Sequence, residues 1–217
     1  AVANATINTW LTIGSDNSVT LTIGSSDMGQ GSFSGLAQVL SEDLMVDYTR
    51  VRLVQGAPTL ANPAPIGTSI MTGGSGVTRN NFWKLRNAAA IARETRVQAA
   101  MNQVGDPSRG QYSVANGVVS HASGVKLTYG QVAPAAALLT PPASAPLVPD
   151  SQLRVIGQSV ARLDIPAKVD GSANAQTLNN NSATIEALGK LSLNTATLNN
   201  TNEHFASALR PYGSPED

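Results

Sequence analysis

The sequence predicts an α+β fold with mixed layers of helix and sheet, and two observations support this prediction. Short runs rich in Thr, Ile, Leu and Val alternate with two longer segments whose apolar residues recur at helical spacing. The resulting order of elements, β-β-α-β-α-β-β-β-α, combines strands that can pair with helices that can cover them. With 217 residues and 41% apolar side chains, the chain can bury a sizeable core.

The first elements are predicted to be a β-hairpin, a helix and a further strand. Residues 9–13 and 19–23 are strand-like and flank a turn cluster at 14–18. Apolar residues at helical spacing predict a helix over residues 33–45. Residues 48–54 then alternate between apolar side chains and arginine, as a half-buried strand does.

The longest predicted helix covers residues 80–104 and ends at Gly105-Asp-Pro107. Prolines make residues 55–68 a predicted loop before it. An apolar stripe recurs every seven residues along the helix, and charged residues are expected on the opposite, solvent-facing side. The stripe consists of Trp83, Ala90, Val97 and Val104, and the charged side of Arg93, Glu94 and Arg96.

A second group of strands follows the long helix. Asn116-Gly117 is typical of a two-residue hairpin turn and separates strand-like residues 112–114 and 118–120. Residues 126–129 predict another strand, and an alanine-rich helical turn begins at Gly130.

The composition divides the chain into four parts. Residues 1–140 are expected to form one α+β domain, and the Pro-rich residues 141–153 a linker. Residues 154–173 are expected to begin a second, β-rich unit. Residues 174–217 form an Asn-rich tail without a clear period, expected to be extended or loosely structured.

Composition excludes several classes of function. A net charge of zero argues against a nucleic-acid surface, and no apolar run approaches the roughly 20 residues of a membrane span. The chain has no cysteine, so it holds no disulfide, catalytic thiolate or iron–sulfur cluster on its own thiolates. His121 and His204 are too far apart for a metal motif. No metal bound by protein side chains is expected, and redox chemistry would need a cofactor with its own metal ligands.

The first candidate binding loop is Asp27-Met-Gly-Gln-Gly31, between a predicted strand and a predicted helix. Two glycines let the backbone approach a ligand while the amide of Gln30 points at it. The helix that follows offers N–H groups and a positive dipole end to an anion. The alternative is a tight strand-to-helix turn with an incidental glutamine.

The second candidate loop, residues 72–79, opens the longest predicted helix. Its glycines, with Ser75 and Thr78, provide N–H and O–H donors at a helix N-terminus, a set suited to phosphate. The segment lacks the Gly-Lys-Ser/Thr ending of a P-loop. The alternative is ordinary helix capping by Ser or Thr, which needs no ligand.

Other polar residues give weaker signals. Glu42 and Asp43 are adjacent in a predicted helix and are expected to be solvated surface. His121 lies in a Ser-rich turn and is expected to face water. No histidine is placed near a nucleophile-like serine, so the sequence does not favour a hydrolase.

Several motifs in one order resemble a known family. The motifs are Thr9-Trp-Leu-Thr-Ile-Gly-Ser-Asp-Asn-Ser-Val-Thr-Leu21, Asp27-Met-Gly-Gln-Gly31, Ser41-Glu-Asp-Leu44, Met71-Thr-Gly-Gly-Ser75, Ala88 to Glu94, Asn116-Gly-Val-Val119, Thr128-Tyr-Gly-Gln131 and Arg162-Leu-Asp-Ile-Pro-Ala-Lys-Val-Asp-Gly171. Together they resemble the N-terminal portion of the large, molybdopterin-binding subunit of molybdenum hydroxylases, in the xanthine oxidase family. The similarity is to the isoquinoline 1-oxidoreductase (its beta chain) and membrane-associated aldehyde dehydrogenase type. It covers about residues 7–173.

Two departures accompany the resemblance. Asp27 stands where the family usually has Glu. After Ala173 the family continues into a β-rich unit, which the Asn-rich residues 174–217 do not resemble.

The resemblance implies a molybdopterin-binding domain whose cofactor is the molybdopterin cytosine dinucleotide. It assigns cofactor binding to Gly29, Gln30, Gly31, Gly73, Gly74, Ser75 and Thr78. The metal's ligands would come from the pterin dithiolene, oxo or sulfido groups and water. Arg79 is expected to be a surface arginine rather than a phosphate ligand.

The chemistry that the resemblance implies is hydroxylation of an aldehyde or an N-heteroaromatic carbon with oxygen from water. The family's base is a glutamate in the C-terminal half, so no catalytic residue is expected in this chain. Neither Glu42 nor Glu94 is matched to that role.

The resemblance also implies partners: the remaining part of the large subunit and an iron–sulfur small subunit that holds the 2Fe-2S clusters. A cytochrome c subunit is an additional candidate, and no nucleic acid is expected. The implied location is the periplasm or the periplasmic face of the inner membrane, although residues 1–5 show no export signal. The alternative function is a non-catalytic binding or structural module without a cofactor.

Overall fold

The computed structural model describes residues 5–8, 11–56, 72–166, 177–181 and 197–201. The chain divides into two compact units, Ala1–Leu163 and Asp164–Asp217. The predictions for residues 9–10 and 57–68 lie outside the described residues.

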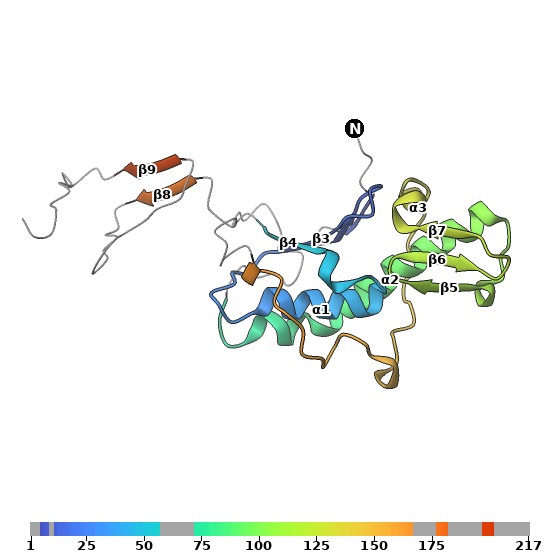
Figure 1. The fold of residues 1–217 in the computed structure, drawn as a ribbon, viewed down its shortest axis with the longest axis horizontal. Helices are drawn as coiled ribbons and strands as arrows, with labels where there is room; N and C mark the ends of the chain where they lie inside the picture. The colour runs from blue at the N-terminus through green and yellow to red at the C-terminus, as the bar shows by residue number, and fades with distance from the viewer. Residues whose placement is uncertain (1–4, 9–10, 57–71, 167–176, 182–196, 202–217) are drawn as a thin grey trace, which may run out of the picture. The chain divides into compact units, whose positions relative to one another are not determined.

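A four-stranded sheet forms one layer of the first unit (Figure 1). It contains β1 (Ala5–Asn8), β2 (Leu11–Ile13), β3 (Val19–Ile23) and β4 (Val51–Gln55), in the order β1-β2-β3-β4. The β2–β3 pair is antiparallel, with Leu11 opposite Leu21, which confirms the predicted hairpin. Apolar side chains of β2 and β3 alternate into the core, as a strand with one covered face requires.

Helix α1 (Ser32–Leu44) connects β3 to β4, and these two strands pair in parallel, with Val19 opposite Val51. The helix confirms the prediction for residues 33–45. The predicted strand from residue 48 was wrong at its start, because Tyr48–Arg50 is a 3-10 turn. The Asp47 side chain accepts the Thr49 N–H at 2.9 Å and thereby caps that turn. The β-α-β unit brings the carboxyl ends of β3 and β4 to one edge, where ligands commonly bind.

Helix α2 (Gly76–Val104) lies beside α1 and packs against it (Figure 1). It begins at Gly76, before the predicted start at residue 80. Both helices contribute to the core together with the sheet. The core includes Leu11, Ile13, Leu21, Ile23, Leu36, Leu40, Leu44, Leu85 and Val97.

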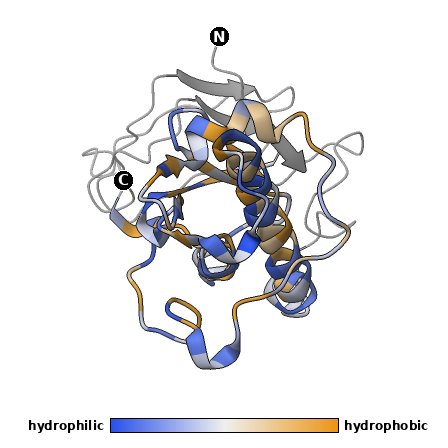
Figure 2. Cartoon of the chain, turned by 90° about the vertical axis from the view of Figure 1, so that its right-hand side faces the viewer, coloured by the Kyte–Doolittle hydropathy of each residue, from blue (hydrophilic) through white to orange (hydrophobic). Residues whose placement is uncertain are grey.

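The expected division of α2 into an apolar face and a charged, solvated face was wrong in part. Arg93 and Arg96 are 3% and 0% exposed, whereas Trp83 is 59% exposed. The reason is that α2 packs against α1, α3 and β6, so it is covered on more than one side. Colouring by hydropathy shows hydrophilic and hydrophobic residues mixed along the helices (Figure 2).

A three-stranded antiparallel sheet follows α2, with β5 (Tyr112–Ala115), β6 (Val118–His121) and β7 (Lys126–Thr128). Asn116 and Gly117 both have positive φ, 49° and 74°, which confirms the predicted two-residue turn. Helix α3 (Tyr129–Ala136) begins where residue 129 was predicted to be strand. The Thr128 and Gln131 side chains form a capping box there.

Residues 146–163, called the strap below, run back along α1. Val148 in the strap is 5% exposed, and Asp150–Gln152 form a 3-10 turn. The prediction that Glu42 and Asp43 are solvated was wrong, because both are 0% exposed beneath the strap. Their carboxylates are compensated by backbone N–H groups and by Arg86, as burial of charge requires.

The α+β layers confirm the predicted fold class. In the second unit, β8 (Thr177–Asn181) and β9 (Thr197–Thr201) form a parallel pair. No helix in the described ranges is long and apolar enough to cross a bilayer.

Candidate functional site

The first candidate loop joins the end of β3 to the start of α1. The Asp27 carboxylate accepts N–H groups from Gly29 at 2.9 Å and from Phe33 at 3.1 Å. Phe33 is the second residue of α1, so Asp27 satisfies one of the N–H groups left free in the first turn of the helix. Gly31, the residue before α1, has φ 79°, a conformation that favours glycine. The N-terminus of α1 is therefore stabilised by the protein's own anion.

The environment of Asp27 favours its ionised form. Burial alone would raise its pKa, but backbone N–H groups of Gly29, Phe33 and Gly31 outweigh that effect. The positive charge of Arg162 acts in the same direction. The net result is a pKa below the ordinary value of an aspartate, so Asp27 is a carboxylate at neutral pH.

The amide of Gln30 folds back onto its own loop. Its Oε1 accepts the Met28 N–H at 2.5 Å, and its Nε2 donates to the Ser26 carbonyl and to Ser32 Oγ, each at 3.1 Å. These bonds give Gln30 a definite orientation. A ligand that takes a hydrogen bond from Nε2 has to replace one of these two acceptors.

The second candidate loop opens α2 and leaves its N-terminus uncapped. Ser75 is the residue before the helix, with φ 56°, and its side chain makes no capping hydrogen bond. The Gly76 N–H donates to the Gly73 carbonyl at 3.0 Å and closes a turn. The alternative of ordinary Ser capping is therefore not what the structure shows. The 29-residue helix α2 begins here, and its first turn, which carries the positive end of the helix dipole, contains no acidic residue.

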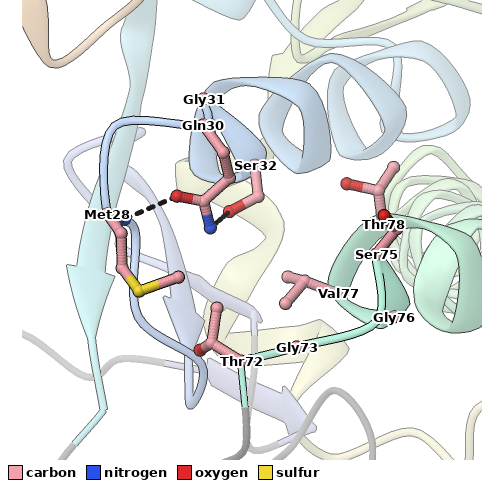
Figure 3. Close-up of a pocket in the computed structure, with 10 residues that line it drawn as sticks. All are labelled: Met28, Gln30, Gly31, Ser32, Thr72, Gly73, Ser75, Gly76, Val77 and Thr78. Carbon is pink, nitrogen blue, oxygen red and sulfur yellow. Dashed lines mark hydrogen bonds between the residues drawn. The ribbon is translucent and has the colours of Figure 1, made fainter.

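The two loops meet at the carboxyl edge of β3 and β4. The Ser26 N–H donates to Thr72 Oγ1 at 2.8 Å, and Gln55 Nε2 donates to Ser26 Oγ at 3.1 Å. Between the loops lies a cavity of about 460 Å³ (Figure 3). Its lining consists of Met28, Gln30, Gly31, Ser32, Thr72, Gly73, Ser75, Gly76, Val77 and Thr78.

The structure brings most of the predicted binding residues together. Gln30, Gly31, Gly73, Ser75 and Thr78 line the cavity. The other two, Gly29 and Gly74, have positive φ of 102° and 56° and shape the loops behind the lining.

Several lining residues were not singled out from the sequence. Met28 and Ser32 lie within or beside the predicted first loop, and Thr72 lies at the start of the second. The hydroxyl of Thr72 could have been recognised as a candidate binding group, because it directly precedes the glycines of the second loop. Nothing in the sequence alone indicated that it bridges to Ser26.

The cavity is suited to holding an anion rather than to acid–base chemistry. Among the ten described residues that line it there is no Asp, Glu, His, Lys or Arg, and their polar groups are N–H, amide and hydroxyl donors. Such neutral donors at a helix N-terminus bind phosphate without a counter-charge. Arg79, expected on the surface, is exposed in the first turn of α2.

The two glutamates considered in the sequence lie elsewhere. Glu42 is buried beneath the strap, where its Oε2 accepts the Val155 N–H at 2.7 Å. Glu94 pairs with Arg109, with Oε2 2.7 Å from Nε. Burial alone would raise the pKa of Glu94, but hydrogen bonds from Arg109 and Arg93 lower it overall. Both are structural carboxylates in these positions.

The prediction that His121 faces water was wrong. Its side chain is 11% exposed, with Nε2 3.0 Å from Asp106 Oδ2 and Nδ1 2.7 Å from Ser123 Oγ. Tyr112 packs against its ring with centroids 4.7 Å apart. Across the described residues, no group of three or more His, Asp or Glu side chains gathers as a candidate metal site.

Fold and site together place a cavity lined by neutral polar groups at the carboxyl edge of a parallel strand pair. The sequence matches the family described as molybdopterin cofactor-binding domain over residues 2–185. The chain belongs to this family, and the resemblance seen in its motifs is confirmed.

Curated relatives extend the comparison. The chain is 30% identical over 171 residues to a membrane-bound aldehyde dehydrogenase [pyrroloquinoline-quinone] of Gluconacetobacter polyoxogenes, covering 76% of this chain and 21% of that protein. It is 29% identical over 210 residues to the beta chain of the isoquinoline 1-oxidoreductase of Brevundimonas diminuta, covering 80% and 27%. It is 28% identical over 163 residues to a nicotinate dehydrogenase component of Pseudomonas putida, covering 75% and 13%. The chain thus spans between 13% and 27% of the length of these relatives.

A solved structure is also similar. The quinoline 2-oxidoreductase of Pseudomonas putida 86 aligns with a TM-score of 0.43 and 24% identity. The alignment covers 58% of this chain and 15% of that one.

Proposed function

We propose that this chain is the cofactor-binding part of a molybdenum-dependent oxidoreductase that hydroxylates an aldehyde or N-heteroaromatic substrate, with water as the oxygen source. The observation that carries the proposal is the convergence of two donor-rich loops on one cavity of about 460 Å³. Membership of the molybdopterin cofactor-binding domain family supports the choice of cofactor. The names of the aldehyde and isoquinoline relatives support the substrate classes.

The cavity fits one part of the proposed cofactor, a phosphate-bearing dinucleotide. Ser75, Thr78 and the N–H groups at the start of α2 would hold phosphate oxygens. The Thr72 hydroxyl accepts the Ser26 N–H and would thereby keep the two loops at a fixed distance from each other. We propose the cytosine dinucleotide form, and when bound the group would supply the redox-active metal together with its ligands.

Gln30 would present its amide to the other end of the cofactor. Its Oε1 and Nε2 are oriented by Met28, Ser26 and Ser32, so the side chain is ordered before the cofactor arrives. The backbone at Gly29, Gly31, Gly73 and Gly74 would allow close approach of the ligand. None of the described lining residues can act as a general base, so the base of the proposed reaction would lie in another part of the protein.

The remaining part of the large subunit and an iron–sulfur subunit are the partners that this proposal requires, with a cytochrome c subunit as a further candidate. The chain has no cysteine to hold an iron–sulfur cluster. The proposed location is the periplasm or the periplasmic face of the inner membrane. Fractionation of cells that produce the full-length protein would test it.

The decisive experiment measures molybdenum by plasma mass spectrometry in the full-length protein isolated with its partners. About one molybdenum per chain, with cytidine monophosphate released by acid, is the expected result. Absence of molybdenum would overturn the proposal, and would leave either a cofactor-free binding module or another cofactor. Pyrroloquinoline quinone would be assayed in the same sample, because one relative's name carries it.

A pair of substitutions at Gly73 tests whether the molybdenum-containing cofactor binds in this cavity. Gly73 has room for a side chain, since a Cβ placed there meets no described residue within 4 Å. Gly73→Asp would place a negative charge at the N-terminus of α2, which favours the helix but repels phosphate. Gly73→Asn is the matched neutral control. We expect molybdenum to be lost in the first variant and retained in the second, and equal loss in both would place the phosphate elsewhere.

A further inference from the structure

The strap ends at the first binding loop, where Arg162 contacts three alternate residues of that loop. Its Nη1 donates to the Gly29 carbonyl at 2.7 Å, and its Nη2 lies 3.7 Å from Asp27 Oδ1. Its guanidinium also covers Gly31, where a Cβ would come within 3.4 Å of Nη1. The residues between these contacts, Met28 and Gln30, line the cavity.

Buried carboxylates on α1 hold the middle of the strap. Asp43 Oδ1 accepts the Val148 N–H at 2.7 Å. Glu42 accepts three successive N–H groups, those of residues 154–156, at 2.7 to 3.0 Å. Both carboxylates are 0% exposed, so water does not compete for these bonds.

Two further side chains of α1 form hydrogen bonds with the strap where it approaches the first loop. Gln38 Nε2 donates to the carbonyls of Val155 and Gln158, each at 3.1 Å. The Leu163 N–H donates to Ser34 Oγ at 3.1 Å. Ser34, Gln38 and Glu42 are spaced by four residues and so lie along one face of the helix. The strap therefore has fixed points on both sides of Arg162.

We propose that Arg162 is a positioning residue, which holds the 27–31 loop in the conformation that presents Met28 and Gln30 to the cavity. Its effect on the loop follows from the contacts above, whereas its consequence for cofactor retention rests on the proposed function. The strap supplies the rigid support, because its backbone is bonded to α1 before and after Arg162.

The geometry requires an arginine. A planar guanidinium can donate to a carbonyl and face a carboxylate at the same time, and it can lie flat over a glycine. A lysine keeps the charge near Asp27 but offers a single point of contact. Arg162→Lys should therefore restore part of the effect that Arg162→Gln removes.

The test uses the full-length protein with its partners and two readouts. Amide hydrogen exchange over residues 26–33 reports on the loop, and molybdenum content reports on the cofactor. In Arg162→Gln we expect loop exchange about fivefold to tenfold faster, with exchange in α2 unchanged and less molybdenum. Arg154→Gln is the matched control on the same strap, since its side chain is 54% exposed and Nε lies 4.0 Å from Glu42 Oε1. Its exchange and molybdenum content should match those of the wild type.

Unchanged loop exchange in Arg162→Gln would overturn the proposal, as would an equal effect of Arg154→Gln. A wild-type protein without molybdenum would overturn the proposed function, while the exchange comparison would still decide the role of Arg162. If Arg162→Gln also loses protection in α2, Arg162→Lys is measured in its place, because it keeps the positive charge beside Asp27. Exchange faster than in the wild type and confined to residues 26–33 would then support the role of Arg162, and wild-type exchange would overturn it.

Discussion

Asp43 and Arg86 bracket a single residue of the strap from two helices. Asp43 accepts the Val148 N–H at 2.7 Å, and Arg86 Nη2 donates to the Val148 carbonyl at 2.6 Å. The two side chains also pair directly, with Nε 2.5 Å from Oδ2. Their side chains are 0% and 2% exposed, so the pair lies in the protein interior.

Arg86→Met should destabilise the protein strongly, because it leaves the Asp43 carboxylate buried with its N–H donor but without a counter-charge. Breaking a buried pair from one side costs about 3–5 kcal/mol. Urea unfolding of the full-length protein, followed by circular dichroism, measures this change. Arg52→Met removes an exposed arginine and should stay within about 0.5 kcal/mol of wild type. Similar losses in both variants would contradict the assignment.

Arg96→Met should have the opposite effect. Arg96 is 0% exposed, and its Nε and Nη2 have no hydrogen-bond partner among the described residues. Burial lowers its pKa to about 10. Replacing it removes unsatisfied donors and should stabilise the fold by about 1–3 kcal/mol. Arg109→Met, which breaks the half-exposed pair with Glu94, should instead lower stability by about 1 kcal/mol at most. A loss at Arg96 larger than that at Arg109 would contradict this view.

Gly31→Ala should destabilise the first loop. Gly31 has φ 79°, and a Cβ there would lie 3.4 Å from Arg162 Nη1, which is an ordinary contact, so the strain comes from the backbone conformation. The left-handed conformation alone costs an alanine about 1–2 kcal/mol. Gly35→Ala lies inside α1, and its Cβ would meet no described residue within 4 Å, so it should stabilise the protein by about 0.5–1 kcal/mol. Melting temperatures of the two variants should move in opposite directions, and a shift in the same direction would contradict the prediction.

Thr72→Val should loosen the contact between the two loops, because the Ser26 N–H loses its acceptor. The expected loss of stability is about 1 kcal/mol. Under the proposed function, molybdenum content should fall by more than this small change explains. Thr140→Val, at the exposed end of the segment after α3, is the control. Equal molybdenum in the two variants would argue against a role for the bridge.

The contribution of Asp27 should depend on pH in a defined direction. Its folded-state pKa lies below that of the unfolded chain, about 3.9. The stabilisation is therefore fully present above that pH and is lost as the pH falls through the folded-state value. The stability difference between wild type and Asp27→Asn should be constant from about pH 5 to 7 and shrink below about pH 4. A difference that persists at lower pH would show that the charge of Asp27 is not responsible.

Local patterns in the sequence predicted most of the elements. The alternation around Leu11 and Leu21 gave the hairpin, and Asn116-Gly117 gave the turn between β5 and β6. Both features depend on neighbours in the chain. The start of α2 was placed too late, because the glycines before residue 80 have low helix propensity and do not show the apolar period.

The sequence predicted each of the two binding loops separately, but it did not predict how the rest of the chain holds them in place. The sequence indicated Gln30 and Ser75 as binding residues, and the structure places both at one cavity. The burial of Glu42 and Asp43 could not be predicted, since the strap residues that cover them follow more than 100 residues later in the chain. Adjacent acidic residues in a helix normally face water, and only the strap reverses that preference.

The contacts of Arg162 with the first loop also form in a defined order during synthesis of the protein. Arg162 follows Gly29 by 133 residues, so the ribosome makes the binding loop well before Arg162. At about 5–20 residues per second, the interval is about 7–27 s. Throughout that time the nascent chain carries Met28 and Gln30 on a loop without its guanidinium. The loop can therefore reach its final geometry only after the strap has emerged and closed along α1.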